Sequence, residues 1–167
     1  MHQLTHRPLR LAAAVAVLAL ALVAALTALP RDQAAATPPS GVTAELLARG
    51  TIGHAGHVRV AGIRLQTRGP VDVVTVHVTF QPGGSTGWHT HPGPALVTVK
   101  TGQLTLRRAK GCRSRTFGPG QTFLEFGPDD VNLTRNGTGA VTETVVTFLL
   151  PAGAPITVDA PAPNCRL

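Results

Sequence analysis

Short runs of alternating apolar and polar residues, separated by glycine- and proline-containing turns, fill most of the chain after residue 50. In the run 70–84 the polar positions are Thr75, His77 and Thr79, and they alternate with the apolar positions Val74, Val76, Val78 and Phe80. A period of two is typical of a strand that buries one of its faces. A series of such strands predicts a β-barrel or a two-sheet jelly roll.

The composition predicts a single β-rich domain. The chain has 167 residues, of which 18 are glycine and 14 are proline, and this length leaves no room for a second core. The only helix candidate after the N-terminal segment is "VTAELLARG", residues 42–50, and this stretch could equally enter the barrel as a strand.

The N-terminal segment has the pattern of an export signal. Arg7 and Arg10 precede an apolar run without charged residues, Leu11 to Leu29, and small residues and prolines follow it. The run is roughly 19 residues long, which is just enough to span a bilayer, so an uncleaved anchor is the alternative. Small-residue sites at 26–28 and 34–36 favour cleavage. We therefore expect residues 1–36 to be a signal peptide or an N-terminal membrane anchor with its linker, and the domain to be extracytoplasmic, either secreted or membrane-anchored.

Two cysteines, Cys112 and Cys165, lie in the exported part of the chain. An even cysteine count in an exported protein predicts a disulfide. The bond would tie the C-terminal tail, residues 161–167, to the barrel, and in the chain-entropy model it stabilises the fold by roughly 4 kcal/mol. A thiolate metal site is the poorer alternative, because such sites usually supply cysteines in close pairs.

The formal net charge of +7 includes the two arginines of the export segment. Much of the remaining positive charge surrounds one turn and comes from Arg107, Arg108, Lys110, Arg113 and Arg115. We interpret this cluster as a solvated hairpin tip rather than a nucleic-acid site, because aromatic residues are only 4% of the chain and export removes it from nucleic acid.

The stretch "GGSTGWHTHPGPALVTVKTGQLTL", residues 83–106, carries two histidines one residue apart, His89 and His91. Residues i and i+2 of a strand point to the same face, so both imidazoles are expected to project into the barrel. Buried imidazoles are costly unless they are hydrogen-bonded or bound to a metal. Trp88, between a glycine and His89, is expected to face away from them and to pack in the core or at its rim.

The spacing of this stretch resembles the first motif of the cupin superfamily. Gly83, five residues, His89, Thr90, His91, three residues, Ala95, six residues and Gly102 follow that motif, which carries glutamate where this chain has Ala95. The resemblance covers about residues 42–160 and is to small exported bacterial single-domain cupins with "GWHxHPGP" in the first motif. It implies a cupin double-stranded β-helix, a jelly-roll barrel, after the N-terminal signal or anchor helix.

The stretch "GPGQTFLEFGPDDVNLTRNG" resembles the second cupin motif, in which a histidine is expected at the position of Asn132. Cupin metal sites combine three histidines and one glutamate around a divalent metal ion (Fe, Mn, Ni or Zn). Here the glutamate and the third histidine are missing, so the resemblance implies a degenerate site of His89, His91 and Asn132.

Other side chains could complete the site. Glu125 lies in the strand of the second motif, but alternation does not say whether it points inward. His77 would lie either inside the barrel or on its outer surface, and His54 and His57 are more distant.

Three functions remain open from the sequence. The first is an exported cupin that binds a small ligand or a weakly held divalent metal through His89, His91, Asn132 and Glu125. The second is a metal-dependent enzyme of the cupin dioxygenase or isomerase type, with catalytic residues unknown. The third is an envelope scaffold or interaction domain. The resemblance also allows a homodimer through edge strands, and membrane contact is expected only through an uncleaved N-terminal segment.

Overall fold

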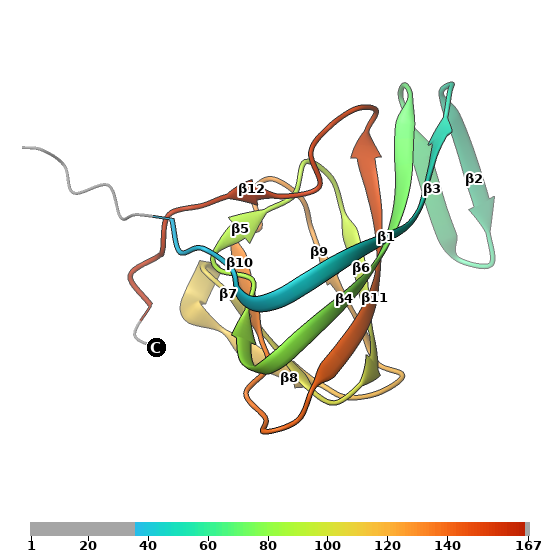
Figure 1. Ribbon diagram of the computed structural model, residues 1–167. Coiled ribbons are helices and arrows are strands. Elements are labelled where there is room, and N and C mark those ends of the chain that lie inside the picture. The colour runs from blue at the N-terminus through green and yellow to red at the C-terminus, as the bar shows by residue number, and fades with distance from the viewer. Residues whose placement is uncertain (1–35, 166–167) are drawn as a thin grey trace, which may run out of the picture. The chain divides into compact units, whose positions relative to one another are not determined.

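The computed structural model describes residues 36–165, which form strands, turns and one short 3-10 helix, η1 (Lys110–Cys112) (Figure 1). Within residues 36–165 there is no α-helix, and so no helix that is long and apolar enough to cross a bilayer. Apart from Ala36, the predicted signal or anchor lies outside the described residues. The predicted all-β class is confirmed.

Ten strands form one continuous antiparallel sheet that curls into a nearly closed barrel with two faces (Figure 1). The first face contains, in spatial order, β1 (Ser40–Ile52), β4 (Val71–Ser85), β11 (Thr142–Pro151), β6 (Ala95–Thr101) and β9 (Thr122–Glu125). The second contains β12 (Val158–Asp159), β5 (His89–Thr90), β10 (Asn132–Arg135), β7 (Leu104–Arg108) and β8 (Ser114–Phe117). The faces join where Ser85, at the end of β4, pairs with Arg135 of β10. This arrangement is the predicted jelly-roll barrel.

The core lies between the two faces and follows the predicted alternation. In β4, Val74, Val76 and Phe80 are buried, and Val78 packs against the same cluster. The remaining core residues come from both faces, and they are Ala95, Val97, Val99, Leu104, Leu106, Phe117, Phe123, Val146, Phe148 and Leu150. The cavity described below opens within this apolar interior.

The segment 42–50, left open as helix or strand, belongs to the strand β1. It pairs with β4 along most of its length, from Val42 opposite Phe80 to Ile52 opposite Val71. The pairing with β4 gives the backbone groups of this segment hydrogen-bond partners along its length. An isolated helix of the same length would be too short to be stable in water. The segment is therefore an entering strand.

Asp72 ties β1 to β4 and to the end of β11. Its buried carboxylate accepts hydrogen bonds from the Thr51 hydroxyl at 2.6 Å, from the Gly153 amide at 2.9 Å and from Arg49 at 2.6 and 3.0 Å. The Thr51 hydroxyl, followed by the Gly153 amide and the Arg49 guanidinium, lowers the pKa of Asp72 to about 2. The carboxylate is thus held ionised at the start of β4.

The strands β2 (Gly56–Val60) and β3 (Ile63–Thr67) form a separate two-stranded sheet between β1 and β4 in the sequence. This hairpin projects beside the barrel at the right of Figure 1. The alternating run "AGIRLQTRG", residues 61–69, is typical of a strand, but nothing in the sequence pairs it with β2. The hairpin is therefore a feature that the sequence did not predict.

The predicted disulfide between Cys112 and Cys165 is present, with a Cα–Cα distance of 5.5 Å. It joins the end of η1 to the C-terminal tail. The basic cluster surrounds the same turn, between β7 and β8. Two of its members lie over aromatic rings, Arg108 over Phe126 and Arg115 over Phe117.

Candidate metal centre

His89 and His91 are both buried, with 4% and 3% of their surfaces exposed. His89 belongs to the short strand β5, and His91 directly follows it. Their ring centroids lie 4.8 Å apart in an edge-to-face arrangement. Both line the cavity inside the barrel. The prediction that the two imidazoles share the interior face agrees with this geometry.

Backbone carbonyls fix the orientation of both rings. Nδ1 of His89 lies 3.0 Å from the Gly87 carbonyl oxygen, and Nδ1 of His91 lies 2.6 Å from the carbonyl oxygen of Ile156. A carbonyl can only accept, so Nδ1 carries the proton in each ring. The other nitrogen, Nε2, is left with its lone pair when the ring is neutral, which is the form that binds a metal.

Two glycines allow the chain to hold these histidines. Gly87 has φ +70°, and a Cβ there would lie 1.9 Å from the carbonyl oxygen of Thr37. A Cβ on Gly93 would lie 2.0 Å from the carbonyl oxygen of Leu149 in β11. Only glycine lets the backbone on each side of the histidine pair pass this close to its neighbours.

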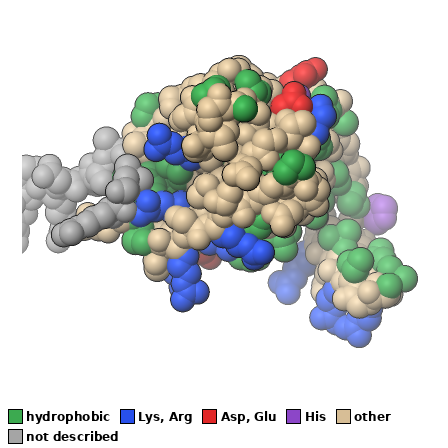
Figure 2. Space-filling view, turned by 90° about the horizontal axis from the view of Figure 1, so that it is seen from below, with side chains coloured by type: hydrophobic (Ala, Val, Ile, Leu, Met, Phe, Trp, Pro, Cys, Tyr) green, Lys and Arg blue, Asp and Glu red, His purple; other side chains and the backbone are tan. Residues whose placement is uncertain are grey.

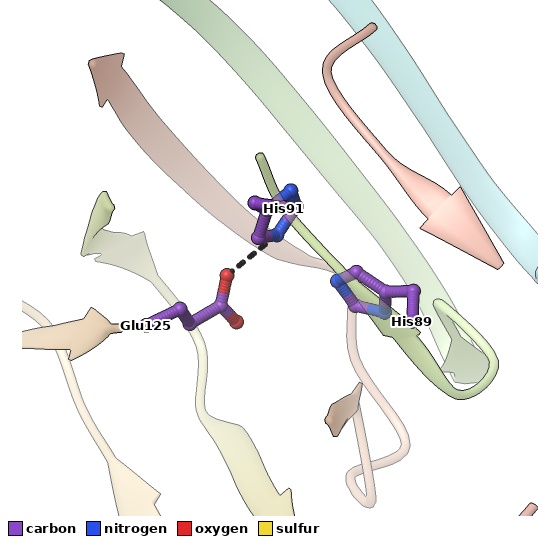
Figure 3. A group of neighbouring side chains, drawn as sticks. All are labelled: His89, His91 and Glu125. Atoms are coloured by element: carbon purple, nitrogen blue, oxygen red, sulfur yellow. Dashed lines mark ion pairs between the residues drawn. The ribbon is translucent and has the colours of Figure 1, made fainter. Parts of the chain in front are cut away.

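Glu125, at the end of β9, brings a carboxylate to the histidines. Glu125 is opposite Ala95 in the pairing of β6 with β9, and directly opposed residues project to the same face of the sheet. Glu125 is 3% exposed, and its Oε2 lies 2.8 Å from Nε2 of His91. Figure 3 shows the three side chains pointing toward one another. The carboxylate therefore enters the barrel beside the position where the cupin motif has its glutamate.

The two imidazoles differ in their proton affinity. Burial is the largest influence on His89 and lowers its pKa below the ordinary value, although Glu125 and the Gly87 carbonyl act in the opposite direction. Burial also acts to lower the pKa of His91, but the hydrogen bond and charge of Glu125, with the Ile156 carbonyl, outweigh it and raise the pKa. In the metal-free protein, a proton on His91 thus stabilises its ion pair with Glu125.

One ligand atom from each of His89, His91 and Glu125 lies within 4.8 Å of the other two. The group faces a cavity of about 420 Å³. Most of the lining is aliphatic or aromatic, and it includes Val42, Ala44, Val76, Val78, Phe80, Val97, Leu104, Val146, Phe148 and Ile156. None of the described residues that line the cavity is lysine or arginine. Two imidazoles and a carboxylate beside an apolar chamber can hold a divalent ion and a small ligand.

The other residues considered from the sequence lie elsewhere. Asn132 is fully buried, but it does not line the cavity, and its amide group donates to the Asp130 carbonyl. His77 is on the outer side of β4, where its ring nitrogens lie 4.0 Å from Glu45 and 3.7 Å from Glu143. His54 and His57 are exposed residues of the hairpin region. Trp88 is buried and 3% exposed.

Asp159 is a lining residue that sequence reasoning missed. It pairs with His89 across β12 and β5, and its charge acts to raise the pKa of that histidine. The two-residue strand that carries it, within "APITVDA", gives no sign of its partner in the sequence. Only the closing of the barrel brings Asp159 to the lining of the cavity.

No protein-family model matches the chain, and no curated protein sequence matches it. Among solved structures, the polyketide cyclase RemF from Streptomyces resistomycificus is similar, with a TM-score of 0.53, 16% identity, and coverage of 81% of this chain and 86% of RemF. This likeness is one of fold, and it agrees with the jelly-roll architecture described above.

Other solved structures are similar over smaller parts. An oxalate oxidase in complex with glycolate is 26% identical over 52% of this chain, with a TM-score of 0.44, and the match spans 45% of that enzyme. The cupin_2 domain of an XRE family transcriptional regulator from Enterobacter cloacae has a TM-score of 0.46 and 15% identity, covering 67% of this chain and 99% of that one. The structural neighbours therefore include cupin-domain proteins, and enzymes are among them.

Proposed function

We propose that the barrel binds a first-row divalent metal ion through His89, His91 and Glu125 and holds a small, mostly apolar molecule beside it. The observation that carries this proposal is the convergence of the three ligand atoms within 4.8 Å in the wall of an apolar cavity. The structure supports Glu125 rather than Asn132 as the third ligand, because Glu125 faces the cavity and Asn132 does not line it.

The donor set fits such an ion. Neutral imidazole and carboxylate suit iron, manganese, nickel and zinc, and carbonyl partners on Nδ1 orient the free Nε2 atoms. A bound ion would supply Lewis acidity toward an oxygen atom of the ligand. The chain itself holds the imidazole rings in place, keeps a carboxylate charge next to them and excludes water through the aliphatic lining.

The lining also defines the class of ligand. Beyond the metal ion itself, a buried carboxylate or phosphate ligand would need further cationic partners, and the described lining residues include no lysine or arginine. Its polar groups are instead hydroxyls and acids, among them Thr86, Thr134 and Asp159. We infer a molecule with an apolar body and one or two oxygen atoms that reach the metal.

Catalysis is the second candidate function. A metal held by three protein ligands would have coordination positions left for a substrate, which is typical of catalytic rather than structural metal sites.

We also propose that the protein works outside the cytoplasm. The disulfide between Cys112 and Cys165 supports this location, because such bonds persist in oxidising compartments.

An exchange of the carboxylate between two paired strands tests the metal site. Glu125→Ala should weaken binding of a divalent ion by at least about 100-fold, since ligand loss exceeds the effect of losing a supporting partner. Because Ala95 is opposite Glu125 and equally buried, Glu125→Ala combined with Ala95→Glu should recover much of that affinity. Titration calorimetry with Zn²⁺ and Mn²⁺ measures both effects.

His77→Gln is the matched control, because it removes an imidazole from the outer side of the barrel. It should leave the metal affinity unchanged. Equal affinity in wild type and in Glu125→Ala, with both proteins folded, would contradict the proposal. So would loss of binding in His77→Gln alone, which would place the ion outside the barrel.

Metal affinity should increase with pH because both imidazoles must be neutral to bind. The pKa of His91 is raised, so the increase should continue above the ordinary histidine value of about 6.5.

In the metal-free protein, the contribution of His91 to the stability of the fold should change with pH in the opposite direction. Protonated His91 stabilises the fold below about pH 6.5 through Glu125, and this contribution is lost as pH rises through the pKa of His91 in the folded state. Thermal unfolding with and without Zn²⁺ across pH 5–9 separates the two trends.

A further inference from the structure

The hairpin β2–β3 carries the most exposed aliphatic cluster of the described chain outside the barrel. Val58, Val60 and Ile63 are 55%, 61% and 66% exposed, and Leu65 is 38% exposed. Val58 is opposite Leu65 and Val60 is opposite Ile63, so all four share one face of the hairpin. A contiguous exposed apolar face of this kind marks an interaction site.

Positive charge follows directly behind the apolar end of the hairpin. Arg59 is opposite Arg64, one residue further from the turn than the Val60–Ile63 pair, and both arginines are exposed. Residues 53–71 contain a third arginine, Arg68, and no aspartate or glutamate. Figure 2 shows hydrophobic and basic side chains together on the lobe at the lower right, which is the hairpin. Counted from the turn, each strand therefore presents an apolar residue first and an arginine next.

The turn keeps the tip free of polar side chains at a conformational cost. Ala61 and Gly62 have φ +48° and +80°, the two left-handed positions of a type I′ hairpin turn. Asparagine or aspartate is usual at the first of these positions. Ala61 and Cys112 are the two non-glycine residues with positive φ in the described part of the chain. Strain that is retained in this way is a sign of function.

We propose that the tip of the β2–β3 hairpin inserts into the surface of a bilayer that contains anionic phospholipid. Residues 60–63 enter the boundary of the acyl chains, and Arg59 and Arg64 reach the lipid phosphates from about 3.4 Å further back along each strand. The order of apolar tip, then cation pair, on both strands matches the order of layers in a lipid surface. Charge complementarity selects anionic lipid, since each arginine near such a surface adds to binding.

The test uses the full chain reconstituted with vesicles whose acyl chains are brominated, made from phosphatidylcholine alone or with phosphatidylglycerol. Ile63→Trp places an indole at the tip. Wild type, in which Trp88 is buried in the barrel and is the sole tryptophan of the chain, gives the background. Leu124→Trp is the matched control, because Leu124 is 45% exposed on the barrel surface. Bromine quenches indole fluorescence only at membrane depth, so the signal reports the tip and not the N-terminal segment.

The indole of Ile63→Trp should be quenched in vesicles with phosphatidylglycerol and little in phosphatidylcholine alone. Adding Arg59→Ala or Arg64→Ala should shift the equilibrium about fivefold toward the withdrawn tip for each arginine removed. Arg113→Ala, at the turn between η1 and β8, makes the same change of charge elsewhere and should have no such effect. Quenching no greater than that of Leu124→Trp overturns the proposal. Equal quenching in the two kinds of vesicle, or no effect of the two arginines, also overturns it.

Discussion

The strand β4 of the barrel and the hairpin β2–β3 use the same kind of sequence with opposite results. Both alternate apolar with polar residues, in β4 from Val74 to Phe80. In β4 the apolar face is covered, and Val74, Val76 and Phe80 are at most 4% exposed. In the hairpin the aliphatic face has no second sheet over it, and Val60 and Ile63 are more than half exposed. Alternation therefore identifies a strand with an apolar face, but it does not identify what that face meets.

This comparison predicts a large difference in how the two regions contribute to stability. Leu150→Ala, at a fully buried position, should reduce the free energy of unfolding by about 2–5 kcal/mol. Ile63→Ala, at a position that is 66% exposed, should change it by less than about 0.5 kcal/mol. Urea denaturation of both variants measures the difference. Similar losses in the two variants would show that the hairpin packs as part of the core.

Close backbone packing should matter in the barrel alone. Gly93→Ala brings a Cβ against the Leu149 carbonyl, and the displacement should destabilise the protein by about 1–3 kcal/mol and weaken metal binding by shifting His91. Gly56→Ala, in β2 of the hairpin, is the control, because nothing lies within 4 Å of a Cβ there. Denaturation and Zn²⁺ titration should both separate the two variants, and a Gly93→Ala protein with wild-type properties would contradict the packing.

Asp72 lies where the hairpin returns to the barrel, and its effect should depend on pH. Its pKa in the folded state is about 2, below the ordinary value, so the stability it contributes is fully present above about pH 4 and is lost as pH falls through 2. Asp72→Asn should be less stable than wild type at pH 6 and equal to it near pH 2. Thermal melts over this range test the sign, and a constant difference at all pH values would contradict it.

The smallest expected effect is within the hairpin. Ala61→Gly removes the cost of a side chain at φ +48° and should stabilise the turn by at most about 1 kcal/mol. Hydrogen exchange of the β2 and β3 amides should slow, while exchange in β11 stays unchanged. A matching slowdown in β11 would mean that the hairpin and barrel unfold together, contrary to the comparison above.

Much of the barrel was predictable because its signals are local. Alternation in 70–84 and the spacing of His89 and His91 depend on residues within one strand, and a strand determines its own faces. The orientation of Glu125 was not predictable, because it depends on the register between β9 and β6, which are separated along the chain. The hairpin was missed for a related reason. Its turn is Ala61-Gly62, which lacks the asparagine or aspartate that usually announces a two-residue turn.

The pairing of Ala95 with Glu125 has a consequence for how motifs of this fold are searched. A motif written along one strand records a functional group by its distance in sequence from its neighbours. In a sheet, however, the residue directly opposite on the neighbouring strand points to the same face and lies as close to the site. Here that residue, Glu125, is thirty residues away from Ala95 in the sequence. A pattern that demands glutamate at position 95 scores this chain as lacking its acid, while a pattern that accepts an acid at either of two paired positions finds it in Glu125, and Asn132 in place of the third histidine is then the one remaining departure. Chains dismissed as inactive relatives because one motif position is empty are therefore worth testing for an acid on the adjoining strand.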